Sequence, residues 1–451
     1  MISTIITSKL TSIKPPKLIT PTKVELKAYF ENTWELYEML FSSIKDDNTL
    51  YESPDPLRNP LIFYLGHTAA FYINKLKLAS LISEGVNDRY DQLFAVGVDP
   101  DAPENLDVSN FWPTVNEVRA YRKTIYNIVQ DVIAKADLSQ MPISENHVLW
   151  ALMMGFEHDR IHFETSSMLI RQLPVDTVQK PEGWEYAPTF GKPQTNQWIQ
   201  MPANTITFGK SKLSNFYGWD NEYGTKTTFV KPFAATENLI TNAEYLGFVN
   251  SGNYNNKAFW TEEGWNWKTK YNVNQPKFWV KNGNFFQYRA MFDNIEMPLD
   301  WPVEVNAHEA CAYCNWKNDG SRLLSEAEFL SIARENTLED EDPIYSDKHN
   351  LDYAFGSPTP VGYMKLGTTA SGFNDIYGNV WDWLSDDFYP LDGFKTHPWY
   401  EEFSAPYMDN EHGMMAGGAW ATTGTGASKY YRLWFRRHFY QHAGFRLAKD
   451  A

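Results

Sequence analysis

His158 and His162 are the residues whose spacing most directly predicts chemistry in this sequence. They lie four positions apart in a segment with a helical pattern, so at about 100° per residue they project from one helix face. Two imidazoles placed in this way can bind one metal ion from a single helix. Glu164 follows two residues after His162 and points about 200° away from it, which makes it a poor third ligand.

A third ligand must come from another segment, and His67 is the best candidate. It lies in the apolar segment LIFYLGHTAAFYINKLKLASLI, where a charged imidazolium would be costly to bury unless its lone pair were used. Three neutral histidines with open coordination positions suit a catalytic divalent ion, and the ligand type allows zinc or iron. Each histidine also has a simpler interpretation as a hydrogen-bonded core residue.

Four segments with helical spacing between residues 22 and 174 must position these histidines. The fourth, ENHVLWALMMGFEHDRIHFETSSMLIRQL, carries the histidine pair and ends before a proline. The expected start signals of the other three are Thr22 with Glu25, Asn59 before Pro60, and Thr114 with Glu117. Four long amphipathic helices predict a four-helix bundle, with the 84–112 connection as a candidate substrate loop.

After Pro174 the composition changes, because Gly, Asn, Pro, Trp and Tyr become dense and apolar runs shorten. This texture predicts short strands and long ordered loops. We therefore expect an α+β protein with an N-terminal extension at 1–21, a metal-binding bundle at 22–174, a linker at 175–195 and a substrate-binding domain at 196–451. The 17 Trp, 26 Tyr and 28 Phe are expected mostly to stiffen the loop-rich domain by aromatic packing.

Charge and cysteine content restrict the partners and the compartment. The formal net charge of −16 argues against nucleic acid and anionic membranes as partners. We see neither a membrane-spanning apolar segment nor an export signal. Cys311 and Cys314, the two cysteines of the sequence, fit a reducing, cytoplasmic setting. Their CxxC spacing is also found in redox and zinc sites, but a buried structural pair is the favoured interpretation.

Several motifs resemble a known family over nearly the whole chain. LGHTAAFYINKLKLA and FEHDRIHFETSSMLIRQLP resemble the DinB-like bundle of the ergothioneine and ovothiol sulfoxide synthases, whose iron-binding pattern matches His67, His158 and His162. TNAEYLGFVNSG, RLLSEAEF, GNVWDWLSDDF and HAGFR resemble the formylglycine-generating-enzyme or sulfatase-modifying-factor fold, which is C-type-lectin-like. The segments FAVGVD, GFKTHPWY and FRRHFYQHAGFR look most like the 5-histidylcysteine sulfoxide synthases of ovothiol biosynthesis.

The sequence departs from this family in one loop, and it lacks a feature of the formylglycine-generating enzymes. DPDAPENLD at 99–107 stands where a more acidic and aromatic loop is expected, which bears on substrate detail. GGAWATTGTGAS contains no cysteine, so the copper-cysteine oxidation of the formylglycine-generating enzymes is not implied.

The resemblance implies a non-haem iron(II)- and O2-dependent oxidoreductase, a sulfoxide synthase that forms a C–S bond between cysteine and the imidazole of histidine. Cysteine, O2 and histidine are then its small-molecule partners, with hercynine as the alternative to histidine. The pocket that binds the substrate amine distinguishes the two. It should be polar for the free ammonium of histidine, and apolar and aromatic for the quaternary ammonium of hercynine. We expect any methylation to need a separate methyltransferase acting downstream.

The resemblance also assigns site residues outside the bundle. A tyrosine near the metal is implied as a proton or hydrogen donor, and GFKTHPWYEEFSAPY favours Tyr400, with Tyr407 and Tyr389 as alternatives. Arg436 and Arg437 offer forked donors for a substrate carboxylate.

Nearby polar residues are weaker candidates. Asp386 or Asp387 could meet a substrate ammonium, while His397, His438 and His442 are expected to be structural or supporting groups.

Two functions from other classes stay open. The three histidines could serve a zinc-dependent DinB-type thiol transferase, which metal analysis would distinguish. The Trp-rich C-terminal domain could also belong to a non-catalytic binding protein, in which case replacing His67 should leave ligand binding unchanged.

Overall fold

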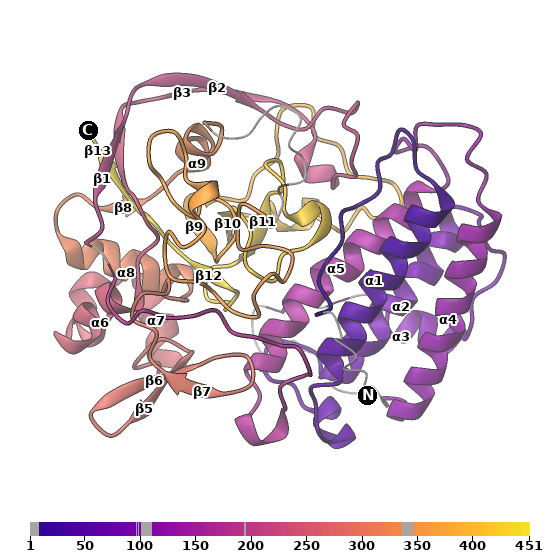
Figure 1. Ribbon diagram of the computed structural model, residues 1–451, viewed down its shortest axis with the longest axis horizontal. Coiled ribbons are helices and arrows are strands. Elements are labelled where there is room, and N and C mark those ends of the chain that lie inside the picture. Colours follow the sequence, from indigo (N-terminus) through magenta and orange to yellow (C-terminus); the bar gives the residue numbers. More distant parts are fainter. Residues whose placement is uncertain are drawn as a thin grey trace, which may run out of the picture. The chain divides into compact units, whose positions relative to one another are not determined.

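The structure, a computed structural model, describes residues 9–95, 97, 99–100, 111–193, 195–335, 344 and 347–451. It divides into a helical unit, Met1–Tyr186 with Met291–Asp293, and a mixed unit, Ala187–Ala290 with Asn294–Ala451. The predicted α+β class, with a helical N-terminal domain and a loop-rich C-terminal domain, is confirmed (Figure 1). Residues 101–107 of the DPDAPENLD segment lie outside the described residues.

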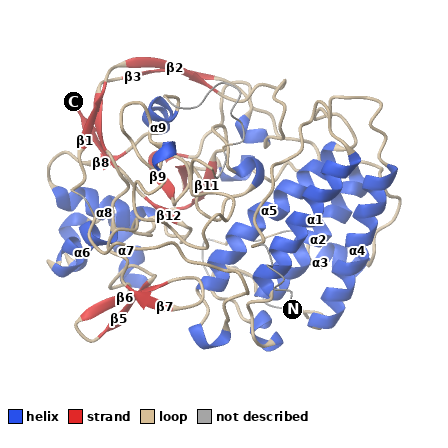
Figure 2. Cartoon of the chain, in the orientation of Figure 1, coloured by secondary structure: helices blue, strands red, loops and turns tan. Residues whose placement is uncertain are grey.

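The helical unit contains the predicted bundle. Its helices are α1 (Lys23–Phe41), α2 (Leu61–Leu78), α3 (Asp88–Leu93), α4 (Val115–Lys135) and α5 (Trp150–Arg171). Helix α2 packs against α4 and α5, and α1 packs against the same two helices (Figure 2). The short α3 falls within the 84–112 connection and contacts α2.

Two predicted capping boxes are confirmed. The Thr22 side chain accepts a hydrogen bond from the Glu25 backbone, and the Glu25 side chain accepts one from the Thr22 backbone at the start of α1. Thr114 and Glu117 make the same reciprocal pair at the start of α4. Each box satisfies two backbone donors that a helix start would otherwise leave without partners.

The predicted cap of α2 is wrong. Pro60, and not Asn59, is the N-cap residue, and its side chain makes no capping hydrogen bond. The Leu61 amide instead donates to the Glu52 carbonyl, at 3.1 Å. A distant backbone acceptor thus replaces the local side-chain cap, which spacing alone does not reveal.

Burial differs between helices according to how many neighbours they have. Helix α2 is buried along most of its length, and His67 with it. Helix α4 buries one face, through residues such as Val118, Ile125 and Val129. The long apolar run around His67 therefore reflects a central helix, because a helix enclosed on several sides needs apolar residues all round.

The mixed unit is built from short elements joined by long loops. Its helices are α6 (Asn242–Asn250), α7 (Glu262–Lys270), α8 (Ala307–Lys317) and α9 (Glu326–Ala333). One sheet has the order β1-β4-β13-β8, formed by Trp198–Met201, Phe233–Thr236, Leu447–Asp450 and Arg322–Leu323. A second has the order β11-β10-β9-β12, formed by Leu433–Arg436, His412–Ala416, Trp381–Asp387 and Ala443–Gly444.

Two smaller sheets complete the described strands of this unit. Strand β2 (Asn204–Phe208) pairs with β3 (Lys226–Val230). Strands β5 (Trp279–Asn282), β6 (Phe285–Arg289) and β7 (Asn294–Glu296) form an antiparallel sheet in chain order.

The C-terminal strand β13 joins distant parts of this unit. Ala448 pairs with Ala235 of β4 on one side and with Arg322 of β8 on the other, both antiparallel. Strand β12 pairs in parallel with β9, with Ala443 opposite Trp381. The GFR ending of the family motif therefore connects β12, the edge strand of one sheet, to β13 in the other.

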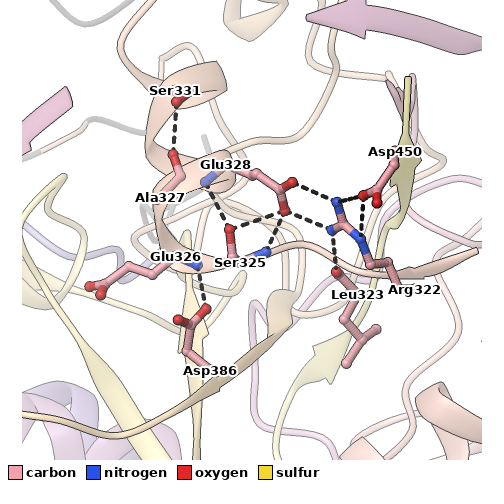
Figure 3. Close-up of polar contacts among 9 residues, drawn as sticks. All are labelled: Arg322, Leu323, Ser325, Glu326, Ala327, Glu328, Ser331, Asp386 and Asp450. Carbon is pink, nitrogen blue, oxygen red and sulfur yellow. Dashed lines mark hydrogen bonds and ion pairs between the residues drawn. The ribbon is translucent and has the colours of Figure 1, made fainter. Parts of the chain in front are cut away.

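The start of α9 shows how the RLLSEAEF motif specifies local structure (Figure 3). Ser325 and Glu328 form a capping box at this start. Both terminal nitrogens of Arg322 donate to the Glu328 carboxylate, at 2.8 and 2.7 Å, and Nη2 also contacts Asp450 of β13 at 2.8 Å. This forked contact ties the helix start to the C-terminal strand.

None of the helices in the described ranges has the length and apolar character that crossing a bilayer would require.

Candidate metal centre

The structure brings His67 of α2 together with His158 and His162 of α5. One ligand atom from each residue lies within 4.8 Å of those of the other two, and the ring centroids are 4.5–4.9 Å apart. Within the described part of the chain, this is the one group of three or more His, Cys, Asp or Glu side chains that could hold a metal ion. Glu164 lies two residues after His162 and is buried, but it does not belong to the group, as the helical geometry predicts.

The orientation of His67 is set by a backbone contact. Its Nδ1 lies 2.6 Å from the carbonyl oxygen of Phe94, the C-cap residue that follows α3. A carbonyl only accepts, so Nδ1 carries the proton and Nε2 keeps its lone pair for a metal. This is the usual arrangement of a metal-binding histidine, whose second nitrogen donates to a carbonyl or carboxylate.

Burial keeps the three imidazoles neutral. It lowers the pKa of His67 to about 4, against the opposing effect of the Phe94 carbonyl. Burial and the neighbouring histidines hold the pKa values of His158 and His162 well below the usual range. At neutral pH all three rings therefore present lone pairs, which is the form that binds a metal.

Aromatic rings support two of the three ligands. The ring of Phe71 stacks on His158 with a centroid distance of 3.5 Å and an interplanar angle of 4°. The ring of Phe63 stacks on His67 at 4.9 Å and 22°. Phe63, His67 and Phe71 repeat at intervals of four on α2, so a single helix face supplies one ligand and two rings that hold ligands in place.

The donor set fits a divalent transition metal. Three neutral nitrogens leave the full charge of the ion in place, and the ligand type accommodates iron or zinc. The Nδ1 of His162 is buried and makes no hydrogen bond within the described part of the chain. A buried nitrogen without a hydrogen bond is costly in a packed core. The three imidazoles together are, however, suited to binding an ion.

The favoured tyrosine, Tyr400, lies in the mixed unit between β9 and β10. Its ring contacts Trp219 edge-on at 6.2 Å and Phe403 at 5.4 Å. Burial is the main cause that raises its pKa above the usual range, with Tyr407, Glu402 and Asp220 adding to it. Tyr400 is therefore a protonated phenol at neutral pH.

The alternative tyrosines have other contacts. The Tyr389 hydroxyl donates to Glu326 at the start of α9, so it is part of an internal polar network. The Tyr407 ring stacks on Trp434 of β11 with a centroid distance of 3.8 Å.

The predicted substrate-binding arginines both form ion pairs inside the mixed unit. Arg437 pairs with Asp387 and also donates to the carbonyls of Asn410 and Glu411, at 3.2 Å each. Arg436 donates to the Glu411 carboxylate at 2.6 Å, and this partner side chain is exposed. Arg436 thus has the more exchangeable of the two carboxylate contacts.

The predicted ammonium-binding aspartates also have partners. Asp387 is paired with Arg437, and Asp386 accepts a hydrogen bond at 2.7 Å from the backbone of Glu326, at the start of α9 (Figure 3). In this structure, Asp386 therefore caps a helix, which the sequence did not indicate because the two residues lie 60 positions apart.

The remaining histidines of these motifs contact protein groups. His442 Nδ1 lies 3.2 Å from Glu304, and both side chains are fully buried. The Nδ1 of His397 accepts from the Trp399 backbone at 3.2 Å. His438 packs on the Phe439 ring at 4.7 Å.

Cys311 and Cys314 lie on α8 as free thiols. Burial raises the pKa of Cys311 to about 11 and holds that of Cys314 well above its usual range. Both are therefore protonated at neutral pH, which agrees with a structural pair and leaves little nucleophilic thiolate.

Sequence reasoning did not identify three contacts around these candidates. The Phe94 carbonyl and the Phe71 ring support the histidines, and the Asp220 carboxylate contacts the segment that carries Tyr400. The interval of four between His67 and Phe71 was a usable signal for the ring. The other two contacts depend on how distant segments meet.

The family comparisons match both units. A family model described as the sulfatase-modifying factor enzyme 1-like domain matches residues 184–451, and the DinB superfamily model matches residues 29–166, which include the three histidines.

Three relatives illustrate what the whole chain is similar to. "Ergothioneine biosynthesis protein 1" of Neurospora crassa is 24% identical over 93% of this chain and 57% of its own length. "Hercynine oxygenase" of Mycolicibacterium smegmatis is 28% identical over 94% of this chain and 98% of its own length. The protein of the same name from Mycobacterium tuberculosis is 30% identical over 51% of this chain and 56% of its own length.

The chain spans little more than half the length of the Neurospora relative. The match over residues 184–451, more than half of the sequence, shows that the chain belongs to the sulfatase-modifying factor enzyme 1-like family, here joined to an N-terminal DinB superfamily domain.

Proposed function

We propose that this protein is an iron- and O2-dependent sulfoxide synthase that joins the sulfur of cysteine to an imidazole carbon of histidine. The carrying observation is the buried group of three neutral histidines in the DinB domain. Its combination with a sulfatase-modifying-factor-like domain supports the same reaction, because relatives spanning both domains are named hercynine oxygenase.

The reaction balances with O2 as the oxidant. The thiol loses its S–H bond and the imidazole loses one C–H bond as the C–S bond forms. One oxygen atom ends in the sulfoxide, and the other leaves as water with the two hydrogens. A ferrous ion held by His67, His158 and His162 would supply O2 activation and binding positions for thiol and imidazole.

The residues of the chain contribute positioning and proton control. The Phe94 carbonyl keeps the proton of His67 on Nδ1, and the Phe71 ring holds the plane of His158. Tyr400 stays a neutral phenol at physiological pH and can donate a proton or hydrogen atom from its hydroxyl. Arg436 can exchange the exposed Glu411 carboxylate for a substrate carboxylate, since both are held by the same donors.

A second candidate uses hercynine in place of histidine, and the names of the Mycolicibacterium and Mycobacterium relatives favour it. The ovothiol-type motifs favour histidine. The two reactions share every residue assigned above. They differ in the pocket that binds the amine of the imidazole substrate, which is a free ammonium in histidine and a quaternary one in hercynine.

Incubation of the purified ferrous protein with cysteine, O2 and either imidazole tests the proposal, with products identified by mass spectrometry. The expected product is the histidylcysteine sulfoxide, and the His158→Ala variant should form none. Preferential use of hercynine would select the second candidate. Oxidation of cysteine without consumption of either imidazole, or stoichiometric zinc with thiol transfer under argon, would reject both.

A further inference from the structure

Tyr400 lies on a stretch of chain that has little regular structure of its own. Between the end of β9 at Asp387 and the start of β10 at His412, the described backbone forms turns, one isolated β-bridge between Asp392 and Thr225, and one short 3-10 helix, Ala405–Tyr407. The Tyr400 amide donates to the His397 carbonyl at 2.9 Å, within the same turn. Because no strand pairing covers the described residues directly around Tyr400, their position depends on contacts with other parts of the unit.

A turn far away in the sequence provides a rigid partner. Within residues 219–222, Glu222 forms a fully buried ion pair with Lys210 at 3.4 Å, and its carboxylate accepts from the Trp219 amide at 2.8 Å. Asn221 donates to the Arg432 carbonyl at 3.0 Å, and Arg432 donates back to the Asn221 carbonyl at 3.2 Å. These contacts tie the 219–222 turn to the interior of the mixed unit.

This turn holds the Tyr400 segment at several points. The Trp219 ring stacks on Phe403 with a centroid distance of 4.1 Å and an angle of 20°, and it meets Tyr400 edge-on at 6.2 Å. The Ser404 hydroxyl donates to Asp220 Oδ1 at 2.7 Å. Tyr400 is thus contacted directly, and the chain is fixed again four residues after it.

The Asp220 carboxylate is buried at a cost in desolvation free energy. Its side chain is 7% exposed, and its Oδ2 is buried without a hydrogen bond among the described residues. Burial raises its pKa to about 6, although the Ser404 hydroxyl and the backbone amides of Asn221 and His397 favour the ionised form. The carboxylate thus contacts the Tyr400 segment at two points, the Ser404 hydroxyl and the His397 amide, and these hydrogen bonds offset part of its desolvation cost.

We propose that Asp220 is a positioning residue for Tyr400, acting through its hydrogen bond with Ser404 together with the packing of Trp219 against Tyr400 and Phe403. The inference rests on the proposed function only in giving Tyr400 the role of hydrogen donor. Asp220 belongs to none of the motifs that pointed to the reaction.

The product ratio of the reaction is the readout, because a hydrogen donor that is out of place should let cysteine oxidation compete with C–S bond formation. In Asp220→Ala and Ser404→Ala, we expect the ratio of cysteine sulfinate to sulfoxide to rise about fivefold, as the loss of one hydrogen bond would produce. Asp220→Asn keeps an oxygen that can accept from Ser404, so its ratio should stay close to that of the wild type. Bound iron should be unchanged in all three variants.

Matched controls separate positioning from general damage. Ser331→Ala removes a buried serine hydroxyl that donates to the Ala327 carbonyl in α9, and Asp375→Ala removes a buried carboxylate that accepts from the Gly362 amide. Neither should change the product ratio.

A double substitution tests whether Asp220 acts through Tyr400. In a Tyr400→Phe background, Asp220→Ala should add no further change to the ratio. An unchanged ratio in Asp220→Ala alone, an additive effect in the double variant, or an unchanged ratio in Tyr400→Phe alone would each overturn the proposal.

Limited proteolysis distinguishes failure of this proposal from failure of the proposed function. If the wild-type protein forms no sulfoxide from either imidazole, the proposed function is rejected, and the contact can still be measured by tryptic cleavage after Lys395. Asp220→Ala and Ser404→Ala should then be cut about fivefold faster than the wild type and Asp220→Asn. Equal cleavage rates would overturn the positioning role whatever the reaction is.

Discussion

The ring of Phe71 lies flat against the imidazole of His158, with centroids 3.5 Å apart and planes within 4° of parallel. Phe71 stands one helical turn after His67 on α2, so the helix that provides one ligand also supports another on α5. This stacking holds the plane of His158, as the Phe94 carbonyl holds that of His67.

Substitution of Phe71 by Leu should weaken metal binding without removing a ligand. We expect the dissociation constant for iron to rise about tenfold, the lower end of what supporting groups around metal sites contribute. Competition with a chelator measures the constant. Phe30→Leu in α1 removes a comparably buried ring that contacts none of the three histidines in the described structure, and equal affinities in the two variants would argue against a specific role for Phe71.

Replacement of His158 or His162 by Ala should abolish stoichiometric iron binding while the fold persists. The bundle has a large apolar core, so its stability does not depend on a single ion. Elemental analysis and circular dichroism measure the two effects. His147→Ala, which changes a histidine just before α5, should retain iron, and retention of full iron by His158→Ala would refute the assigned site.

Tyr400→Phe should divert product from the sulfoxide toward cysteine sulfinate or a thioether. The variant keeps the ring that packs on Trp219 and Phe403 but lacks the hydroxyl that would donate hydrogen. Chromatography of the products gives the ratio. Tyr389→Phe is the matched control because its hydroxyl donates to Glu326, and a shift there with none in Tyr400→Phe would move the role to Tyr389.

Substitution of both Cys311 and Cys314 by Ala should spare turnover. Burial keeps both thiols protonated, so neither is expected to act as a nucleophile at neutral pH. Alkylation of the native protein by iodoacetamide should therefore be slow and should become fast after denaturation. Loss of turnover in the double variant would contradict the structural assignment.

Asp220 should also make the stability of the mixed unit depend on pH. Burial raises its folded-state pKa from 3.8 to about 6, so the protonated carboxyl favours folding. That contribution is fully present below about pH 4 and is lost as the pH rises through about 6. At pH 8, Asp220→Asn should therefore raise the unfolding free energy by about 1–3 kcal/mol, and the gain should shrink at pH 4. Thermal or urea unfolding at the two pH values measures this, and an equal effect at both would show that the charge of Asp220 is not the cause.

The helices and the pairing of His158 with His162 on one helix face could be predicted because their signals are local. The intervals of three and four residues in the first 174 positions follow from the geometry of the α-helix, and the capping boxes of α1 and α4 follow from side-chain chemistry over three residues. The start of α2 was mispredicted because its first amide bonds to the Glu52 carbonyl, a partner outside the local pattern. Asp386 and Glu326 escaped prediction for the same reason.

The sequence by itself determined which residue types were available for a metal site and which helix faces would carry them. Only the tertiary structure decided the arrangement of α2 against α5, which brings His67 to His158 and His162 and puts Phe71 behind one of them. It also decided that Asp220 meets Ser404 across 184 positions of chain. Periodicity and capping operate over a few residues, whereas these contacts depend on how the faces of separate elements pack once water is excluded between them.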